Sequence, residues 1–147
     1  MAVTQLSVMI ENSPGKAEDI LGALAKAKVD IRAISVADTA DHGVVRLIVN
    51  NPAKAKAVLK RKGLTVISAP VLAVVVHDAP GALAKLLEPL AKKNLNVEYL
   101  YGTTCACSNA SCGCSEEGCD NVIVLRVKNA RKAEAALKAA GHKTVRP

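Results

Sequence analysis

The pentapeptide ENSPG at residues 11–15 recurs as HDAPG at residues 77–81, 66 positions further along the chain. Each copy follows a short apolar run. Each also precedes a segment in which apolar residues return every three or four positions, the spacing of one face of an amphipathic helix. The chain therefore contains an internal repeat, and we assign a first domain to residues 1–69 and a second to residues 70–147.

The Pro-Gly pair in each copy is typical of a helix start. Proline at the first helical position has a preset φ and lacks only an N–H that would have no partner inside the helix, and Ser13 is a suitable N-cap before it. The glycine lets another group approach the backbone closely. Because a helix start carries free N–H groups and a partial positive charge, it attracts a carboxylate. An ordinary helix start that binds nothing is the alternative.

Both halves of the chain predict the element order β-α-β-β-α-β, which can form a ferredoxin-like α+β unit. In the first half we expect strands at residues 3–10, 31–37, 44–49 and 64–68, and helices at residues 14–28 and 52–62, the second of them capped by Asn50-Asn51-Pro52. In the second half we expect strands at residues 71–76, 97–101, 122–127 and 143–145, and helices at residues 80–93 and 130–140. Pro89 lies inside the third predicted helix, where it removes a hydrogen bond and should bend the helix.

Composition indicates a soluble cytoplasmic protein with an aliphatic core. Half of the residues are apolar, but the chain has no Trp, no Phe and only two Tyr. The longest apolar run, residues 69–76, is too short to span a membrane, so we predict no membrane partner. The N-terminus lacks the basic start and apolar block of a secretory signal.

The net charge of +7 invites a nucleic-acid hypothesis. The lysines and arginines gather on the predicted helices at residues 52–62 and 130–140, opposite apolar positions, and we interpret them as a solvated face. RNA-recognition modules share the strand order, but they stack bases on aromatic side chains, and only Tyr99 and Tyr101 are available here. We therefore predict no nucleic-acid partner.

The chain resembles the ACT-domain family of small-molecule-binding regulatory modules, as a tandem pair without a catalytic domain. The residues that carry the resemblance are 8–12, the Ser13-Pro14-Gly15 turn and 20–24, with residues 29–31, 78–81 and 96–99. The resemblance implies two ferredoxin-like units side by side, joined in one antiparallel eight-stranded sheet with helices on one face.

The resemblance also implies an amino-acid ligand at the junction between the units, near the Pro-Gly turns. The residues it assigns to ligand binding are Asn12, Ser13, Pro14, Gly15, Asp78, Ala79, Pro80 and Gly81. Backbone N–H groups at Gly15 or Gly81 can hold the ligand carboxylate, while Asn12 or Asp78 can accept a hydrogen bond from its ammonium.

The two implied sites are chemically unequal. His77 stands where the first copy has Glu11, and Ala79 replaces Ser13. One of the two sites is therefore a candidate for a vestigial site that no longer binds a ligand. We expect His77 to be a surface residue at a strand end. Because the chain lacks aromatic residues that could stack on a ligand ring, a small or polar amino acid is favoured over an aromatic one.

The second copy is twelve residues longer between its second and third predicted strands, and this Cys-rich loop, at about residues 103–120, contains every cysteine of the chain. These are Cys105, Cys107, Cys112, Cys114 and Cys119. Four thiolates can close a tetrahedral zinc site, and C-x-C pairs also suit Cu(I), so zinc or another soft metal is a candidate cofactor. Disulfides and a flexible thiol-bearing loop are the alternatives, and an iron–sulfur cluster is less well supported.

No Ser, His and acid pattern or other catalytic constellation accompanies these thiols, and we predict that the protein is not an enzyme. The leading hypothesis is an amino-acid-binding regulatory module. It would act on a partner enzyme or regulator, or through its own homo-oligomer. The alternative is a metal- or redox-responsive protein that acts through the Cys-rich loop.

Overall fold

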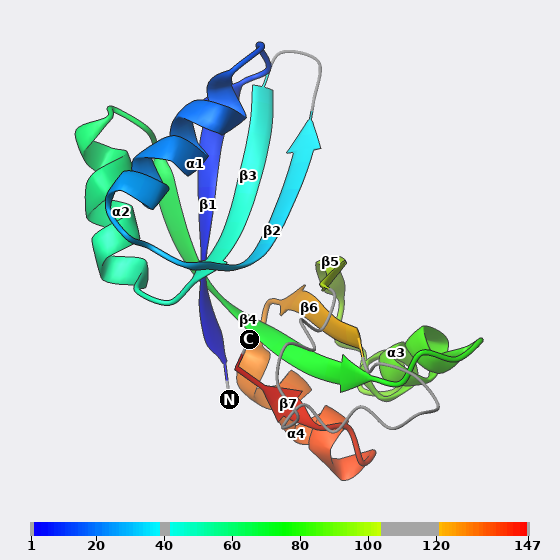
Figure 1. Cartoon of the computed structure of the whole chain (residues 1–147). Helices are drawn as coiled ribbons and strands as arrows, with labels where there is room; N and C mark the ends of the chain where they lie inside the picture. The colour runs from blue at the N-terminus through cyan, green and yellow to red at the C-terminus, as the bar shows by residue number, and fades with distance from the viewer. Residues whose placement is uncertain (1, 39–41, 104–120, 147) are drawn as a thin grey trace. The chain divides into compact units, whose positions relative to one another are not determined.

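The computed structural model describes residues 2–38, 42–103 and 121–146 of the chain (Figure 1). The elements in chain order are β1 (Val3–Glu11), α1 (Lys16–Lys26), β2 (Ile31–Asp38), β3 (His42–Val49), α2 (Pro52–Arg61), β4 (Val66–Val76), α3 (Ala82–Lys92), β5 (Val97–Thr103), β6 (Asn121–Val127), α4 (Ala130–Ala139) and β7 (Thr144–Val145). They fold into two compact units, Thr4–Ala69 and Pro70–Pro147 with Met1–Val3. None of the described helices is long and apolar enough to cross a membrane.

The first unit has the strand order β2-β3-β1-β4, and β3 is antiparallel to both β1 and β2. Alternate residues of β1 point toward the helices, so Leu6 and Val8 are fully buried. Helices α1 and α2 contribute Ile20, Leu24 and Leu59 to the same core. Both helices therefore cover one face of this sheet, as Figure 1 shows.

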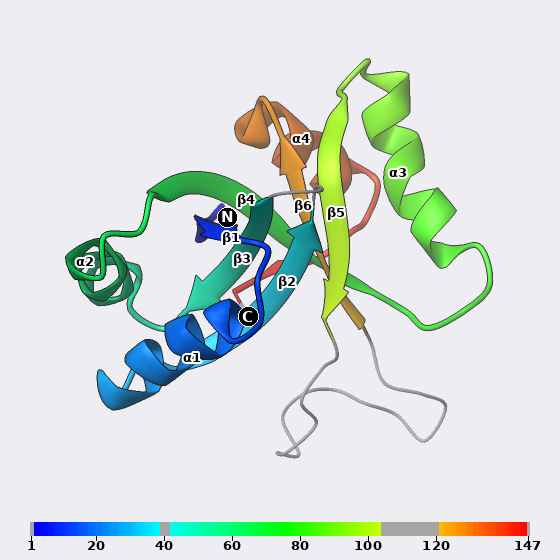
Figure 2. The ribbon, with the colours of Figure 1, turned by 90° about the horizontal axis from the view of Figure 1, so that it is seen from above.

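The second unit repeats this arrangement. Its strand order is β4-β6-β5, and β7 also pairs with β4. Leu72 of β4 lies opposite Leu125 of β6, and both are fully buried. Helices α3 and α4, which Figure 2 shows beside β5 and β6, contribute Leu86, Leu90 and Leu137 to this core. The predicted α+β class with two ferredoxin-like units is confirmed.

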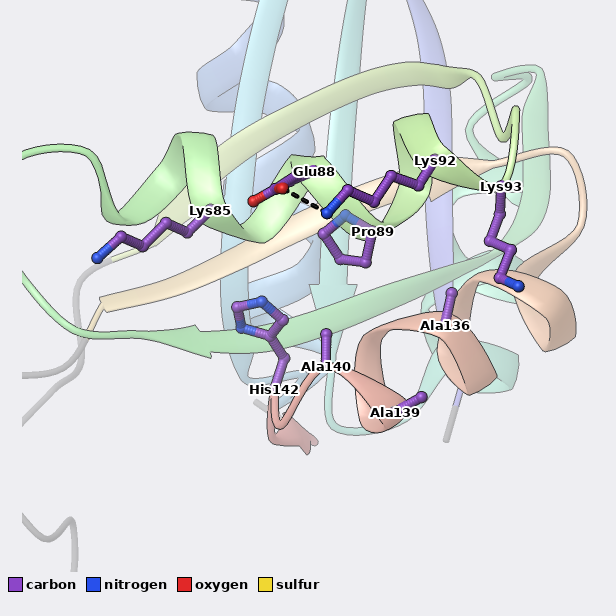
Figure 3. Close-up of a pocket in the computed structure, with 9 residues that line it drawn as sticks. All are labelled: Lys85, Glu88, Pro89, Lys92, Lys93, Ala136, Ala139, Ala140 and His142. Carbon is purple, nitrogen blue, oxygen red and sulfur yellow. Dashed lines mark ion pairs between the residues drawn. The ribbon is translucent and has the colours of Figure 1, made fainter.

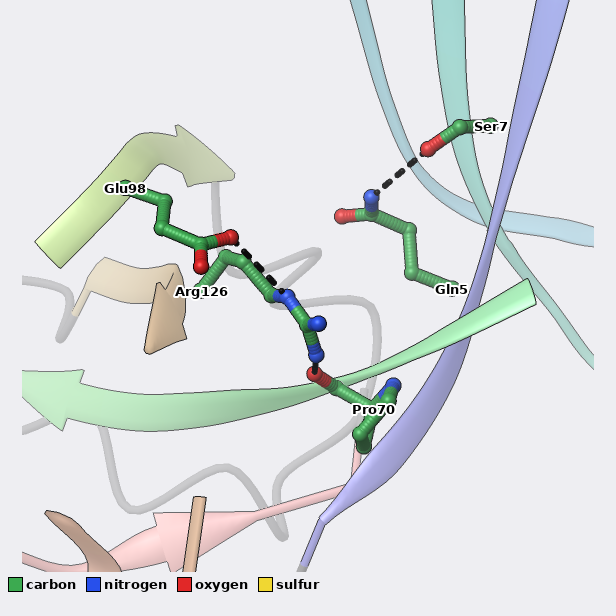
Figure 4. Close-up of polar contacts among 5 residues, drawn as sticks. All are labelled: Gln5, Ser7, Pro70, Glu98 and Arg126. Carbon is green, nitrogen blue, oxygen red and sulfur yellow. Dashed lines mark hydrogen bonds and ion pairs between the residues drawn. The ribbon is translucent and has the colours of Figure 1, made fainter. Parts of the chain in front are cut away.

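The expected count of eight strands is wrong by one, because β4 takes the place of two predicted strands. The sequence predicted separate strands at residues 64–68 and 71–76, yet β4 continues through Pro70 without a break. Proline donates no hydrogen bond to a sheet, but its carbonyl still accepts one. The Arg126 guanidinium of β6 donates to the Pro70 carbonyl oxygen at 2.6 Å and to Glu98 at 3.3 Å (Figure 4). The described strands therefore number seven.

Two of the four helices in the described part of the chain begin at an asparagine N-cap. The Asn51 side chain accepts from the Lys54 N–H at 3.0 Å, and the Asn129 side chain accepts from the Lys132 N–H at 3.1 Å. The prediction that the Asn-Asn-Pro segment caps the second helix is confirmed. Helix α3 continues past Pro89 to its end at Lys92.

Candidate functional site

The two Pro-Gly turns have the same backbone geometry. In the first, Gly15 has φ 84° and ψ −15°, and the Lys16 N–H donates to the Ser13 carbonyl at 3.4 Å. In the second, Gly81 has φ 81° and ψ −6°, and the Ala82 N–H donates to the Ala79 carbonyl at 3.1 Å. Proline followed by a glycine with positive φ is the type II β-turn.

This geometry corrects the predicted helix starts. Helix α1 begins at Lys16 rather than at the preceding proline, and its N-cap is Gly15, not Ser13. Helix α3 has the same N-cap arrangement at Gly81, again without a side-chain cap. A Cβ on either glycine would meet no atom within 4 Å. The glycines are therefore needed for their positive φ rather than for space.

All eight residues that the resemblance assigned to ligand binding lie exposed on these two turns. The first N–H groups of each helix precede its first intrahelical bond, which runs from Asp19 to Gly15 in α1 and from Lys85 to Gly81 in α3, at 2.9 and 3.0 Å. Each turn thus presents backbone donors of the kind that bind a carboxylate.

A small pocket of about 320 Å³ adjoins the first turn. It is lined by Ile10 of β1, Lys16, Asp19 and Ile20 of α1, and Lys62 and Leu64 between α2 and β4. Ile10 and Ile20 are buried and form an apolar floor. The Lys62 ammonium donates to the Asp19 backbone carbonyl at 3.3 Å, and Lys16 pairs with Glu11 at 3.4 Å. The pocket thus combines an aliphatic floor with a charged rim.

The second unit differs in charge at the equivalent positions. Lys85 stands where the first unit has Asp19, and Ala140 stands where it has Lys62. A groove of about 560 Å³ opens here between α3 and α4, and the first unit has the equivalent groove of about 480 Å³ between α1 and α2. Figure 3 shows the residues that line the groove of the second unit, which are Lys85, Glu88, Pro89, Lys92, Lys93, Ala136, Ala139, Ala140 and His142. The two units therefore present unequal surfaces beside otherwise similar turns.

One ion pair lies on the rim of this second groove. The Lys92 ammonium is 2.6 Å from a Glu88 carboxylate oxygen, one helical turn away on α3 (Figure 3). The hydrogen bond from Lys92, with its positive charge, lowers the pKa of Glu88 below the ordinary 4.5. Glu88 is therefore ionised near neutral pH and already engages Lys92.

The charged residues of the first pocket were not predicted from the sequence. A signal was available within α1, because Lys16, Asp19 and Ile20 are spaced three and four residues apart and share one helix face. Lys62 comes from the end of α2, and only the folded chain brings it to Asp19. Comparison of the two repeats would also have shown that Asp19 corresponds to a lysine, Lys85.

The predicted metal ligands Cys105, Cys107, Cys112, Cys114 and Cys119 lie outside the described residues. Within residues 2–38, 42–103 and 121–146, no group of three or more His, Cys, Asp or Glu side chains is placed to hold a metal ion. Zinc or another soft metal at the Cys-rich loop stays a prediction.

The fold and the duplicated turns define a tandem pair of ferredoxin-like units with donor-bearing helix starts. The chain belongs to the family of ACT domain pairs, whose profile matches residues 1–140. The resemblance inferred from the repeats is confirmed, and the fold is a regulatory one. A comparison with curated proteins gives no match.

Solved structures agree with this assignment. Protein BT0572 from Bacteroides thetaiotaomicron is 29% identical, with a TM-score of 0.84 over 99% of this chain and 92% of that one. The ligand-free regulatory subunit of aspartate kinase from Thermus thermophilus is 20% identical, with a TM-score of 0.63 over 94% and 90%. The corresponding subunit from Thermus flavus is 19% identical, with a TM-score of 0.62 over 94% and 90%. The two kinase subunits share the fold.

Proposed function

We propose that the protein is a non-catalytic regulatory module that binds a small amino acid beside its Pro-Gly turns. The observation that carries the proposal is the duplicated type II turn of an ACT domain pair, after which the second and third N–H groups of α1 and α3 precede the first intrahelical bond and are available to a carboxylate. Asn12 and Asp78, exposed on the turns, are suitable acceptors for the ligand ammonium. Placement of the ligand at the junction of the units is a further prediction from the resemblance.

The module would act on a partner enzyme or regulator in the cytoplasm. The regulatory subunits of aspartate kinase, which share its fold, support a partner of this kind. A ligand can switch such a module only by binding two of its states with different affinity. Association with a second copy would supply two such states.

A thermal-shift screen of the full chain against the common amino acids tests the proposal. A ligand at about one hundred times its dissociation constant should stabilise the fold by about 2.7 kcal/mol. We expect one or two amino acids to raise the melting temperature, and Asn12→Ala to reduce that rise. Asp78→Ala is the matched variant on the second turn and separates the two turns. If no amino acid raises the melting temperature, the proposal is wrong.

The five cysteines favour a second candidate function, a metal or redox response through the loop at about residues 103–120. The same screen, repeated with a chelator, addresses it. A large loss of stability with chelator, removed when Cys105, Cys107, Cys112 and Cys114 are replaced by serine, would support a bound soft metal. An unchanged melting temperature in chelator would count against it.

A further inference from the structure

We infer that the pocket beside the first turn selects a short aliphatic amino acid, and that the second unit has no equivalent site. This inference rests on the proposed function and gives it a ligand class and a position, with Lys62 and Asp19 in place of the turn N–H groups and Asn12 as the charged partners of the ligand. The pocket lies within the first unit, between α1, β1 and the segment that joins α2 to β4. Its volume of about 320 Å³ lies at the small end of the range for ligand sites.

The charges on the rim match those of a zwitterion. The Asp19 carboxylate has no ion-pair partner among the described residues, so it can accept from a ligand ammonium. The Lys62 ammonium is held at the pocket by the Asp19 backbone carbonyl, 3.3 Å away, which leaves two of its three N–H groups for a ligand carboxylate. A carboxylate and an ammonium thus both line one small pocket.

The floor sets the choice of side chain. Ile10 and Ile20 are buried, Leu64 is half-buried, and none of the three offers a hydrogen bond. A polar ligand side chain placed there would lose its hydrogen bonds to water without replacing them. An aliphatic side chain would instead gain from burial, by about 0.8 kcal/mol per methylene. The floor therefore favours alanine or valine over serine or aspartate.

The second unit lacks both charges at the corresponding positions. Lys85 replaces the carboxylate of Asp19 and would repel an ammonium, while Ala140 replaces Lys62 and has no charge to offer a carboxylate. The floor position of Leu64 is taken by the polar His142. The groove between α3 and α4, whose counterpart in the first unit lies between α1 and α2, has lysines on its rim. One ligand per chain follows from this difference.

Titration calorimetry of the full chain tests the inference with valine, alanine, serine and aspartate. Isobutylamine, which lacks the carboxylate, and 3-methyl-2-oxobutanoate, which lacks the ammonium, are the matched probes. We expect valine to bind with one site per chain and about tenfold more tightly than serine, and both analogues to bind at least tenfold more weakly than valine. Asp19→Asn and Lys62→Gln should each weaken valine binding about tenfold.

Lys85→Gln is the control variant, because it changes the equivalent position in the second unit and should leave valine binding unchanged. If an amino acid binds but Asp19→Asn and Lys62→Gln do not affect it, or if two equal sites appear, the inference is overturned while the proposed function stands. If no amino acid binds at all, both are wrong. Asp19→Asn keeps the size of the side chain, so a folded variant is available for the measurement.

Discussion

The two turn glycines show how one residue fixes the start of a helix. Gly15 has a φ of 84°, a region that costs other L-residues about 1–2 kcal/mol. We expect Gly15→Ala to lower the free energy of unfolding by about 1 kcal/mol in urea denaturation, although the new Cβ would touch nothing. Gly22, inside α1, is the control. Gly22→Ala should raise the free energy by about 0.5–1 kcal/mol, and equal losses in both variants would contradict the argument.

The Glu88–Lys92 pair supplies a pH-dependent prediction at the same scale. The pKa of Glu88 lies below 4.5 in the folded chain, so the pair stabilises the fold above pH 4.5 and this contribution is lost as the pH falls through the lowered pKa. An NMR titration of the Glu88 carboxyl carbon should give a pKa below 4.5, and Lys92→Met should return it toward that value. Glu134, whose pKa is lowered by Lys138, should not change in this variant.

Which residues could be identified from the sequence depended on how local their interactions are. The asparagine cap at Asn51 acts three residues along the chain, and the pattern predicted it. Ser13 was wrongly chosen as N-cap, because a proline fits both the first position of a helix and the second position of a type II turn. Lys62 could not be assigned to the first pocket, because its partner Asp19 is 43 residues away.

At the scale of one element, the equivalent helices α1 and α3 differ in a proline that only α3 contains. Pro89 of α3 corresponds to Ala23 of α1 and cannot donate to the Lys85 carbonyl. We expect Pro89→Ala to raise the free energy of unfolding by about 1–2 kcal/mol, since it restores one helical hydrogen bond and improves helix propensity. The reciprocal change, Ala23→Pro, should lower it by about 3 kcal/mol. Urea denaturation of both variants checks the pair, and a destabilised Pro89→Ala would contradict it.

The elements were largely predictable because their signals are periodic. All four helices were expected within two residues of their observed ends, since apolar spacing and caps lie within the helix itself. Strand β4 was predicted as two separate strands, because a proline such as Pro70 is typical of the end of a strand. Contacts from other strands accompany its extended path, namely the pairing of β4 with β1, β6 and β7 and the hydrogen bond from Arg126 to the Pro70 carbonyl. No pattern along the chain encodes that hydrogen bond.

For the whole molecule, the internal repeat made the family recognisable, but it did not indicate the candidate ligand site in the first unit. Two weak motifs in register identified an ACT domain pair, because agreement between copies is improbable by chance. The same agreement suggested two comparable sites. The differences that separate them, Asp19 against Lys85 and Lys62 against Ala140, lie outside the repeated turn. The fold could therefore be predicted from the motifs that the two repeats share. The candidate ligand site is instead identified by the positions at which the repeats differ.

Association with a second copy is the remaining prediction for the whole molecule. Among the described strands, β2 pairs only with β3, and two neighbouring side chains on it, Ile34 and Val36, are 42% and 56% exposed. A free strand edge with exposed aliphatic side chains is a surface that pairs readily with another strand. The free edge of the second unit, β5, has Leu100 packed against the core and Gly102 in place of Val36. We therefore expect the chain to form a homo-oligomer through β2.

Light scattering after size exclusion measures this association. Val36→Lys should shift the protein toward the monomer, because a charge at the edge opposes strand pairing. Ile67→Lys is the matched control, since Ile67 is 55% exposed but lies on β4, which pairs with β1, β6 and β7. A wild-type chain that is monomeric at all concentrations, or an equal shift in both variants, would show that β2 is not the contact. In that case regulation would have to act within one chain or through a different partner.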